Sequence, residues 1–341
     1  MLMSSALLDA LKKNPFVLAP MAGITDCAFR SFMRPLGTPV VVTELVSANG
    51  LKFNSEKTKK LMEFEEVQRP VGIQIFGETP EAMAEAAASV EEYGADFVDI
   101  NFGCPVKKVV KKGAGSAALK DLVFLRELVH ATKSAIKIPL TIKIRTGWDC
   151  DSKNADEVCQ IAYEEGVTWV AIHGRTRSQA YSGQADWEYL QWVKENSPIP
   201  VIGNGDVTSA GIANKRLRES KCDGVMIGRG CLKNPWLFQE SLNIFNFEQQ
   251  VDIEKDYSKV IFQLKTSLER TQEERVVGLQ IKKFASWYSA GFPGSSQFRK
   301  SVFQSKSLDE TLDRTLTFFQ NVSYYQKKDT SHEPFLMGGH G

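Results

Sequence analysis

The stretch Phe97-Val98-Asp99-Ile100-Asn101-Phe102-Gly103-Cys104-Pro105 joins an apolar run, typical of a buried strand, to a loop that holds a cysteine. Gly103 lets the backbone approach a ligand closely, and Pro105 fixes the turn. Cys104 is therefore predicted at the carboxyl end of a strand, where α/β proteins bind their ligands. A lone cysteine in an arbitrary sequence is more often an inert buried residue, so the surroundings of Cys104 must decide its role.

A basic run follows this loop at Lys107, Lys108, Lys111 and Lys112, and the glycine-rich segment 113–116 comes next. A thiol beside a cationic loop indicates an acid, a nucleophile or a thiolate that faces an anionic substrate.

Working outward, short apolar runs that end in a polar residue or glycine recur eight times, at Phe16–Pro20, Val40–Glu44, Val71–Phe76, Phe97–Asn101, Leu140–Ile144, Trp169–His173, Val201–Asn204 and Gly224–Gly228. Helical patterns lie between them, including Pro80–Tyr93, Asp121–Ala135, Ala155–Glu165 and Ala185–Glu195. Continuous apolar strands are typical of a parallel sheet that is buried on both faces. Eight such units predict an α/β fold of the TIM (β/α)8 type, with an open doubly wound sheet as the alternative.

In a barrel, the polar residue that closes each strand points into one shared mouth. The residues expected there are Met21, Ala22, Glu44, Gln74, Asn101, Cys104, Lys143, Arg145, His173, Arg175, Asn204, Asp206, Gly228 and Arg229. One polar strand end is usually just solvated, but a full circuit of them predicts an active site. The seventh and eighth units end in Gly203-Asn204-Gly205-Asp206 and Gly228-Arg229-Gly230, where barrels commonly bind phosphate, so a phosphorylated cofactor is expected.

Composition narrows the class of protein. The chain has 341 residues, of which 43% are hydrophobic, and its formal net charge is +1, so any nucleic-acid surface must come from local clusters. Its six cysteines form no CxxC pair, which argues against a zinc site and a disulfide framework. No signal peptide or long apolar segment is recognisable. We therefore expect a cytoplasmic protein without a membrane segment or a metal.

The pattern changes after Trp236, where helices are predicted at Tyr257–Glu269 and Thr311–Gln320 and no strand pattern returns. We expect a barrel over residues 1–245, a small all-helical domain over 246–328, and a disordered tail over 329–341 in which His340 is incidental. No acidic residue occurs between Arg275 and Leu308, while cations alternate there with Phe284, Trp287, Tyr288, Phe292, Phe298 and Phe303. This pattern fits two interpretations equally well. The cations and aromatics could form an RNA-binding face, or the aromatics could be a helical core and the cations its solvated side.

Three motifs carry a resemblance to a known family. They are Ala19-Pro20-Met21-Ala22-Gly23-Ile24-Thr25-Asp26 with Phe29-Arg30, Asn101-Phe102-Gly103-Cys104-Pro105, and His173-Gly174-Arg175-Thr176-Arg177. Over nearly its whole length the chain resembles the tRNA-dihydrouridine synthases, most closely the bacterial B-type subgroup.

The resemblance implies an FMN site and a division of roles among the mouth residues. The implied flavin residues are Pro20, Met21, Ala22, Gln74, Lys143 and His173, with Asn204, Gly205, Asp206, Gly228 and Arg229 around the ribityl phosphate end. The implied substrate residues are Asn101, Arg145 and Arg175 near the base and Lys282, Lys283, Arg299 and Lys300 along the RNA. Cys104 is implied as the acid that delivers a proton to C5 of the uridine, and NADPH or NADH as the reductant.

One departure concerns the helical domain. Lys282-Lys283-Phe284 stands ahead of Trp287-Tyr288, where the B-type pattern has an Arg-Lys-His run. Lysine in place of arginine loses the planar guanidinium, and phenylalanine in place of histidine loses a polar contact. The position of the target uridine therefore stays open, as does the choice between tRNA and ribosomal RNA. The expected function is reduction of the C5=C6 bond of uridine in tRNA by a monomer. The alternatives are the same chemistry on ribosomal RNA, a flavin barrel that acts on a free pyrimidine, and a non-catalytic RNA-binding protein.

Overall fold

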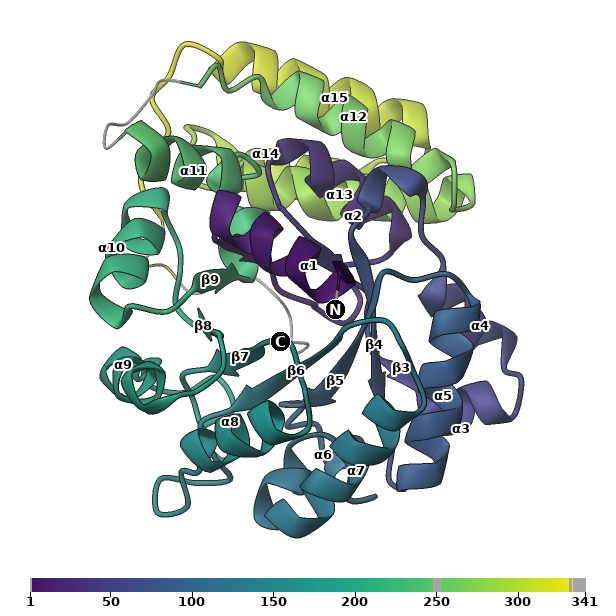
Figure 1. Ribbon diagram of the computed structural model, residues 1–341. Helices are drawn as coiled ribbons and strands as arrows, with labels where there is room; N and C mark the ends of the chain where they lie inside the picture. The colour runs from purple at the N-terminus through teal and green to yellow at the C-terminus, as the bar shows by residue number, and fades with distance from the viewer. Residues whose placement is uncertain (1, 248–252, 331–332, 334–341) are drawn as a thin grey trace.

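A computed structural model describes residues 2–247, 253–330 and 333. Within these ranges, strands and helices alternate over the first two thirds of the chain, and helices alone follow (Figure 1). The strands are β1 (Phe16–Leu18), β2 (Val41–Val42), β3 (Val46–Ser47), β4 (Val71–Phe76), β5 (Phe97–Phe102), β6 (Leu140–Arg145), β7 (Val170–His173), β8 (Val201–Asn204) and β9 (Gly224–Ile227).

All strand pairs are parallel, and the order around the sheet is β1-β9-β8-β7-β6-β5-β4-β2, with β3 also paired to β4. The first strand lies beside the last, and on its other side Leu18 N donates to Thr38 Oγ1 just ahead of β2, at 3.2 Å. The order follows the sequence without the reversal that defines a doubly wound sheet. The predicted TIM barrel is confirmed, and the open-sheet alternative is wrong.

The predicted strand Val40–Glu44 is interrupted. Its place is taken by β2 and β3, which pair with the beginning and the end of β4. Between them, the amide of Gln74 donates to Thr43 Oγ1 at 3.1 Å. A side-chain hydroxyl replaces a main-chain carbonyl of the ladder at this point, so the strand is broken there.

The outer helices of the barrel are α2 (Cys27–Met33), α3 (Ala48–Lys52), α4 (Glu56–Met62), α5 (Pro80–Glu92), α6 (Lys107–Val110), α7 (Leu122–Ser134), α8 (Ala155–Glu164), α9 (Trp187–Asn196) and α10 (Ala210–Ser220). Short 3-10 turns lie at η1 (Arg34–Leu36), η2 (Glu66–Gln68), η3 (Gly115–Lys120) and η4 (Arg229–Leu232). The four predicted helices are present within two residues at each end. Thr79, Asp121 and Asp186 cap α5, α7 and α9 by accepting a first-turn amide.

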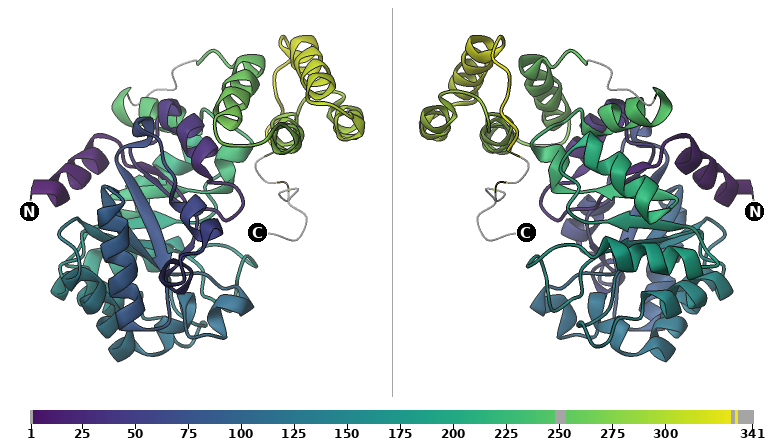
Figure 2. Two further views of the ribbon diagram at one scale, coloured as in Figure 1. Left: turned by 90° about the vertical axis from the view of Figure 1, so that its right-hand side faces the viewer. Right: turned by 90° about the vertical axis from the view of Figure 1, so that its left-hand side faces the viewer.

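The N-terminal helix α1 (Leu2–Lys13) was not predicted from the sequence. Its side chains Leu7 and Leu11 are buried in a cluster with residues at the amino ends of the strands, including Phe97 and Trp169. A Cβ on Gly224, the first residue of β9, would lie 2.8 Å from Leu11 Cδ1. Helix α1 therefore closes the end of the barrel opposite the carboxyl ends of the strands, and Figure 2 shows it on the far side from the C-terminal helices.

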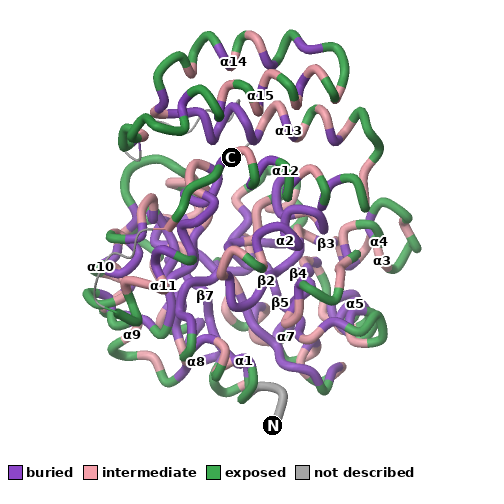
Figure 3. The backbone as a smooth tube through the Cα atoms, turned by 90° about the horizontal axis from the view of Figure 1, so that it is seen from above, coloured by how far each residue is buried: buried purple, intermediate pink, exposed green. Residues whose placement is uncertain are grey.

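The C-terminal helices are α11 (Leu237–Phe247), α12 (Tyr257–Glu269), α13 (Glu274–Tyr288), α14 (Ser295–Gln304) and α15 (Leu308–Val322). Five of the six aromatic residues in the acid-free segment are buried, and only Phe303, at 58% exposure, projects into solvent. These aromatics form the core of the helical domain and are not free to stack on bases. Figure 3 shows the same alternation of buried and exposed turns along α13, α14 and α15.

The helical domain is attached to the β1 side of the barrel. Phe284 stacks on Phe29 of α2 with ring centroids 5.2 Å apart, and Arg270 pairs with Glu65 at 2.7 Å. The domain limits at 245 and 328 stay a prediction. The predicted tail lies outside the described residues except for 329, 330 and 333, and His340 is among those outside. No helix in the described ranges is long and apolar enough to span a membrane.

Candidate active site

A cavity of about 560 Å³ opens at the carboxyl ends of the strands. It is lined by every residue expected around the flavin, namely Pro20, Met21, Ala22, Gln74, Lys143, His173, Asn204, Gly205, Asp206, Gly228 and Arg229. Asn101, Cys104, Arg145 and Arg175 line it as well. The cations Lys282, Lys283, Arg299 and Lys300 belong to the helical domain and do not line it. The barrel thus brings the predicted mouth residues together.

The Cys104 loop is held by the last residues of β5. Asn101 Oδ1 accepts the amides of Gly103 and Cys104, at 3.1 and 2.8 Å, and its Nδ2 donates to Gln74 Oε1 at 2.9 Å. Ser116 Oγ donates to the carbonyl of Cys104 at 2.8 Å. The thiol therefore sits on a loop whose main chain is hydrogen-bonded on both sides.

This hydrogen-bond chain continues into the barrel through a carboxylate that sequence reasoning missed. Gln74 Nε2 donates to Asp99 Oδ2 and Thr141 Oγ1 donates to Asp99 Oδ1, both at 2.6 Å. Burial raises the pKa of Asp99, and both hydrogen bonds offset part of that shift. The signal available in the sequence was an acidic residue in the middle of a strand that is otherwise apolar.

Cys104 is 9% exposed, and burial raises the pKa of its thiol. The amide of Val106 and the cations of Arg145 and Lys143 offset only part of this effect. The sulfur therefore holds its proton at neutral pH. The chain's other five cysteines are also free thiols, and Cys150 is the exposed one.

Two further groups in the cavity have altered protonation. Burial and the neighbouring Arg145 lower the pKa of Lys143 to about 8, and Lys143 Nζ lies 3.5 Å from Asn204 Oδ1. Burial and the surrounding cations lower the pKa of His173 well below its usual value. His173 is therefore neutral at pH 7, while Lys143 changes charge close to physiological pH.

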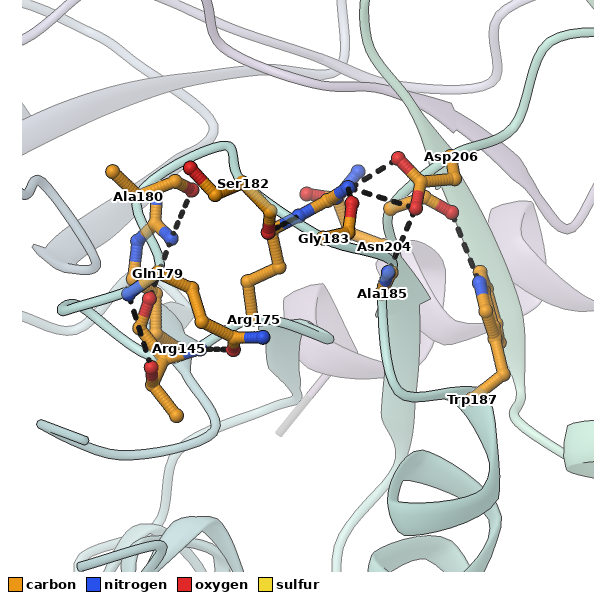
Figure 4. A network of polar contacts seen from close by, with 12 residues as sticks. Arg145, Arg175, Gln179, Ala180, Ser182, Gly183, Ala185, Trp187, Asn204 and Asp206 are labelled. Carbon is orange, nitrogen blue, oxygen red and sulfur yellow. Dashed lines mark hydrogen bonds and ion pairs between the residues drawn. The ribbon is translucent and has the colours of Figure 1, made fainter. Parts of the chain in front are cut away.

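Arg145 is 3% exposed, and its Nε and Nη1 donate to main-chain carbonyls. Its guanidinium donates to Gly103 O, Thr176 O and Ala180 O at 2.8 to 2.9 Å. Figure 4 shows Arg145 beside Ala180. Arg145 thereby ties the Cys104 loop to the loop after β7. Burial lowers its pKa to about 10, so it stays cationic at pH 7.

Arg175 and Asp206, expected from the sequence to contact substrate and cofactor, form a pair with each other. The two guanidinium nitrogens of Arg175 each lie 2.9 Å from one carboxylate oxygen of Asp206 (Figure 4). Arg175 also donates to Ser182 O and Gly183 O, and Asp206 accepts the amide of Ala185. A bidentate pair of this kind fixes both loops in place, so both side chains act in positioning here.

Arg229 has a different environment. Within the described part of the chain, its guanidinium forms no hydrogen bond or ion pair, and it stacks only on Tyr181, at 5.1 Å from the ring centroid. Tyr181 also lies 5.7 Å from the Arg145 guanidinium, and sequence reasoning did not identify it. A Cβ at Gly228 would meet protein atoms only at 3.8 Å, so packing does not demand glycine there. This corner therefore offers an unpaired cation and room for an anionic group.

In the loop after β1, Glu44 and Lys283 both hold the backbone of Gly23. Glu44 Oε1 accepts the amide of Gly23, and Lys283 Nζ donates to the carbonyl of Gly23 at 3.1 Å. Lys282 Nζ donates to Ser305 O at 2.6 Å within the helical domain. Both lysines are thus engaged with main-chain carbonyls, whereas Lys300 is exposed.

Comparison with known proteins identifies the family. A family model described as dihydrouridine synthase (Dus) matches residues 17–323. The chain belongs to the dihydrouridine synthase family. Its members are flavin-dependent oxidoreductases, and the family resemblance read from the three motifs is confirmed.

Individual relatives of the dihydrouridine synthase family agree over most of the chain. The chain is 37% identical over 313 residues to a probable tRNA-dihydrouridine synthase of Rickettsia bellii, covering 90% of this chain and 95% of that protein. It is 38% identical over 290 residues to tRNA-dihydrouridine synthase B of Pseudomonas putida, covering 84% and 86%. The Vibrio cholerae protein of that name is 36% identical over 316 residues, covering 91% and 97%.

A solved structure supports the fold alone. The 6-hydroxypseudooxynicotine amine oxidase of Pseudomonas geniculata matches with a TM-score of 0.54 at 13% identity, covering 74% of this chain and 50% of that one. In the described residues of this dihydrouridine synthase family member, no group of three His, Cys, Asp or Glu side chains is placed to hold a metal ion.

Proposed function

We propose that this chain binds FMN in the barrel cavity and, with NADPH as reductant, reduces the C5=C6 bond of a uridine in tRNA to dihydrouridine. The choice of tRNA over ribosomal RNA is supported by the relatives, which are named tRNA-dihydrouridine synthases. Each of them matches this chain over most of its own length. The observation that carries the chemistry is a protonated thiol, Cys104, in the same cavity as the flavin residues.

The cavity residues fit a flavin mononucleotide. Arg229 supplies an unpaired guanidinium for the phosphate, beside the glycines at 205 and 228. Pro20, Met21, Ala22 and Gln74 also line the cavity and would hold the ring. When bound, the flavin supplies the hydride that reduces the pyrimidine.

The chain's own residues then have separate tasks. Cys104 donates the proton that the pyrimidine needs at C5, and burial keeps that proton on the sulfur until it is used. Lys143 carries positive charge below about pH 8 and stabilises negative charge that develops on the base. Neutral His173 can donate or accept a hydrogen bond without adding charge. The uridine must leave its stack to enter the cavity, which costs a few kcal/mol.

The test is Cys104→Ala, with Cys150→Ala as the matched control because Cys150 is exposed. The Cys104 variant should keep its flavin absorbance and its oxidation of NADPH while dihydrouridine formation in tRNA falls about 10²- to 10⁴-fold. The Cys150 variant should behave as wild type in all three measurements. Wild-type product formation by Cys104→Ala would show that the thiol is a packing residue.

A further inference from the structure

Packing and pairing within the protein do not explain the basic run that follows the Cys104 loop. Lys107, Lys108, Lys111 and Lys112 are all exposed, on and just after the short helix α6. Within the described residues, the side chains of the first three form no hydrogen bond or ion pair, and Lys112 Nζ lies 3.8 Å from Glu78 Oε1. Four cations in six residues form a strong local excess in a chain whose net charge is +1.

These lysines lie at the rim of the cavity. The cavity is lined by Cys104, Pro105 and Val106, and Lys107 is the next residue. Val106 is 53% exposed, so the chain emerges from the cavity into solvent at this point. The basic run therefore begins where the Cys104 loop leaves the cavity.

The run lies across the mouth from the helical domain. In the strand order, β5 and β9 lie on opposite sides of the barrel. Three strands, β6, β7 and β8, separate them on one side, and three others, β4, β2 and β1, separate them on the other. The helical domain meets the barrel on the β1 and β9 side, where Lys283 donates to Gly23 O and α13 packs near η4. Figure 1 places α6 at the bottom of the view and α12 and α15 at the top.

We propose that Lys107, Lys108, Lys111 and Lys112 bind the RNA phosphates next to the uridine in the cavity, as a second contact surface opposite the helical domain. The inference rests on the proposed function. A nucleotide whose base enters the cavity brings its own flanking phosphates to the rim, and unpaired ammonium groups there neutralise them. Lys282 and Lys283 of the helical domain already donate to protein carbonyls. The lysines without such a partner that follow Cys104 in sequence belong to the barrel.

The experiment compares Lys107→Ala/Lys108→Ala with Lys12→Ala/Lys13→Ala, a matched pair on α1 at the closed end of the barrel. The probe is an unmodified tRNA transcript, whose affinity is measured over a range of salt concentrations. The α6 variant should bind several-fold more weakly at low salt, and its log–log salt slope should fall by roughly 1.4 to 1.8, since each lost phosphate contact removes about 0.7 to 0.9. The α1 variant should match wild type.

Flavin content and the rate of NADPH oxidation should be unchanged in both variants, because none of the four lysines lines the cavity. A slope for the α6 variant equal to that of the α1 variant overturns the proposal and makes the run a solvated face. Slower product formation with an unchanged slope overturns it too, because the lysines would then act on the loop and not on phosphate. If wild type forms no dihydrouridine in tRNA, the proposed function fails, and the slopes still decide whether the surface binds RNA.

Discussion

Four cationic side chains line the cavity, and their surroundings place them in different states. Arg145 donates hydrogen bonds to three main-chain carbonyls, and Arg175 forms an ion pair with Asp206. Lys143 keeps its charge against the effect of burial, whereas Arg229 has only an aromatic ring beside it. Arg145 and Arg175 therefore support the loops, and we expect Lys143 and Arg229 to be the cations that respond to an anionic ligand.

Arg229→Ala should release the flavin. A charge-assisted hydrogen bond contributes about 1.5 to 3 kcal/mol, so the dissociation constant should rise roughly 10- to 150-fold. Flavin content after gel filtration measures the loss. Arg177→Ala is the control, because Arg177 stacks on Trp148 at 4.5 Å and does not line the cavity. Full flavin occupancy in the Arg229 variant would place the phosphate elsewhere.

Lys143→Met should stabilise the flavin-free protein at neutral pH. The folded state lowers the pKa of Lys143 from 10.5 to about 8, so below pH 8 it must carry a charge that burial disfavours. This penalty amounts to at most about 3 kcal/mol, and it disappears as the pH rises from 8 towards 10.5. The variant should therefore exceed wild type in unfolding free energy at pH 7 and lose most of that advantage by pH 10.

Urea unfolding at the two pH values measures this difference, and Lys12→Met at an exposed site is the control. An equal unfolding free energy for Lys143→Met and wild type at pH 7 would show that the ammonium is better solvated than its surroundings indicate.

At the scale of the elements, three neighbouring strands share one polar chain through the barrel. It runs from Thr141 on β6 through Asp99 on β5 and Gln74 on β4 to Asn101, which holds the Cys104 loop. The Asp99 carboxylate only accepts and the amides of the Cys104 loop only donate. The side-chain amides of Gln74 and Asn101, which lie between them, therefore each turn their nitrogen towards Asp99 and their oxygen towards the loop along the chain. Asp99 is thereby a positioning residue for the thiol, although it lies one layer below the cavity.

Asp99→Asn should disturb this chain. The new amide can still accept from Gln74 through Oδ1, but its Nδ2 must donate to Thr141 Oγ1, so that hydroxyl has to turn towards another acceptor such as the carbonyl of Val98, at 3.4 Å. Two hydrogen bonds to a carboxylate become weaker neutral ones, which should cost about 1 to 3 kcal/mol of unfolding free energy and slow dihydrouridine formation. Thr141→Val is the comparison, since it removes a single donor and leaves the rest of the chain intact. An Asn variant as stable and as active as wild type would mean that Asp99 does not set the loop.

At the scale of the whole molecule, the barrel and the helical domain are joined at several points around β1. The Phe29–Phe284 stack, the Glu65–Arg270 pair and the Lys283 contact to Gly23 all cross this boundary. RNA bound to the helical domain would therefore be held at a defined distance from the cavity. Within the described residues, the side chains of Arg299 and Lys300 on α14 form no hydrogen bond or ion pair, and Lys300 is exposed.

Arg299→Ala/Lys300→Ala should reduce tRNA affinity and lower the log–log salt slope by roughly 1.4 to 1.8, for the same reason of counterion release. Flavin content should stay at the wild-type level, because the two residues are remote from the cavity lining. Equal affinity at every salt concentration would leave the helical domain without a role in RNA binding through these residues.

The sequence by itself determined the repeating part of this protein. Apolar runs of strand length with capped helices between them specify parallel strands buried on both faces, and eight of them close into a barrel. Closure brings the residue at the end of each strand to a common mouth, so Cys104, Lys143 and Arg229 could be placed together from their positions alone. Such local patterns report which face of an element is buried, and they need no knowledge of distant partners.

The tertiary structure alone decided how those residues are used. Arg175 meets Asp206 across 31 positions and Gln74 meets Asp99 across 25, pairings that no local periodicity encodes. The C-terminal aromatics were equally compatible with a core and a surface, and tertiary packing buried them, against other helices of the domain as at Phe298 and against the barrel as at Phe284. The physical reason is that burial and hydrogen bonding in this cavity are set by the closure of the barrel, which determines what each side chain faces.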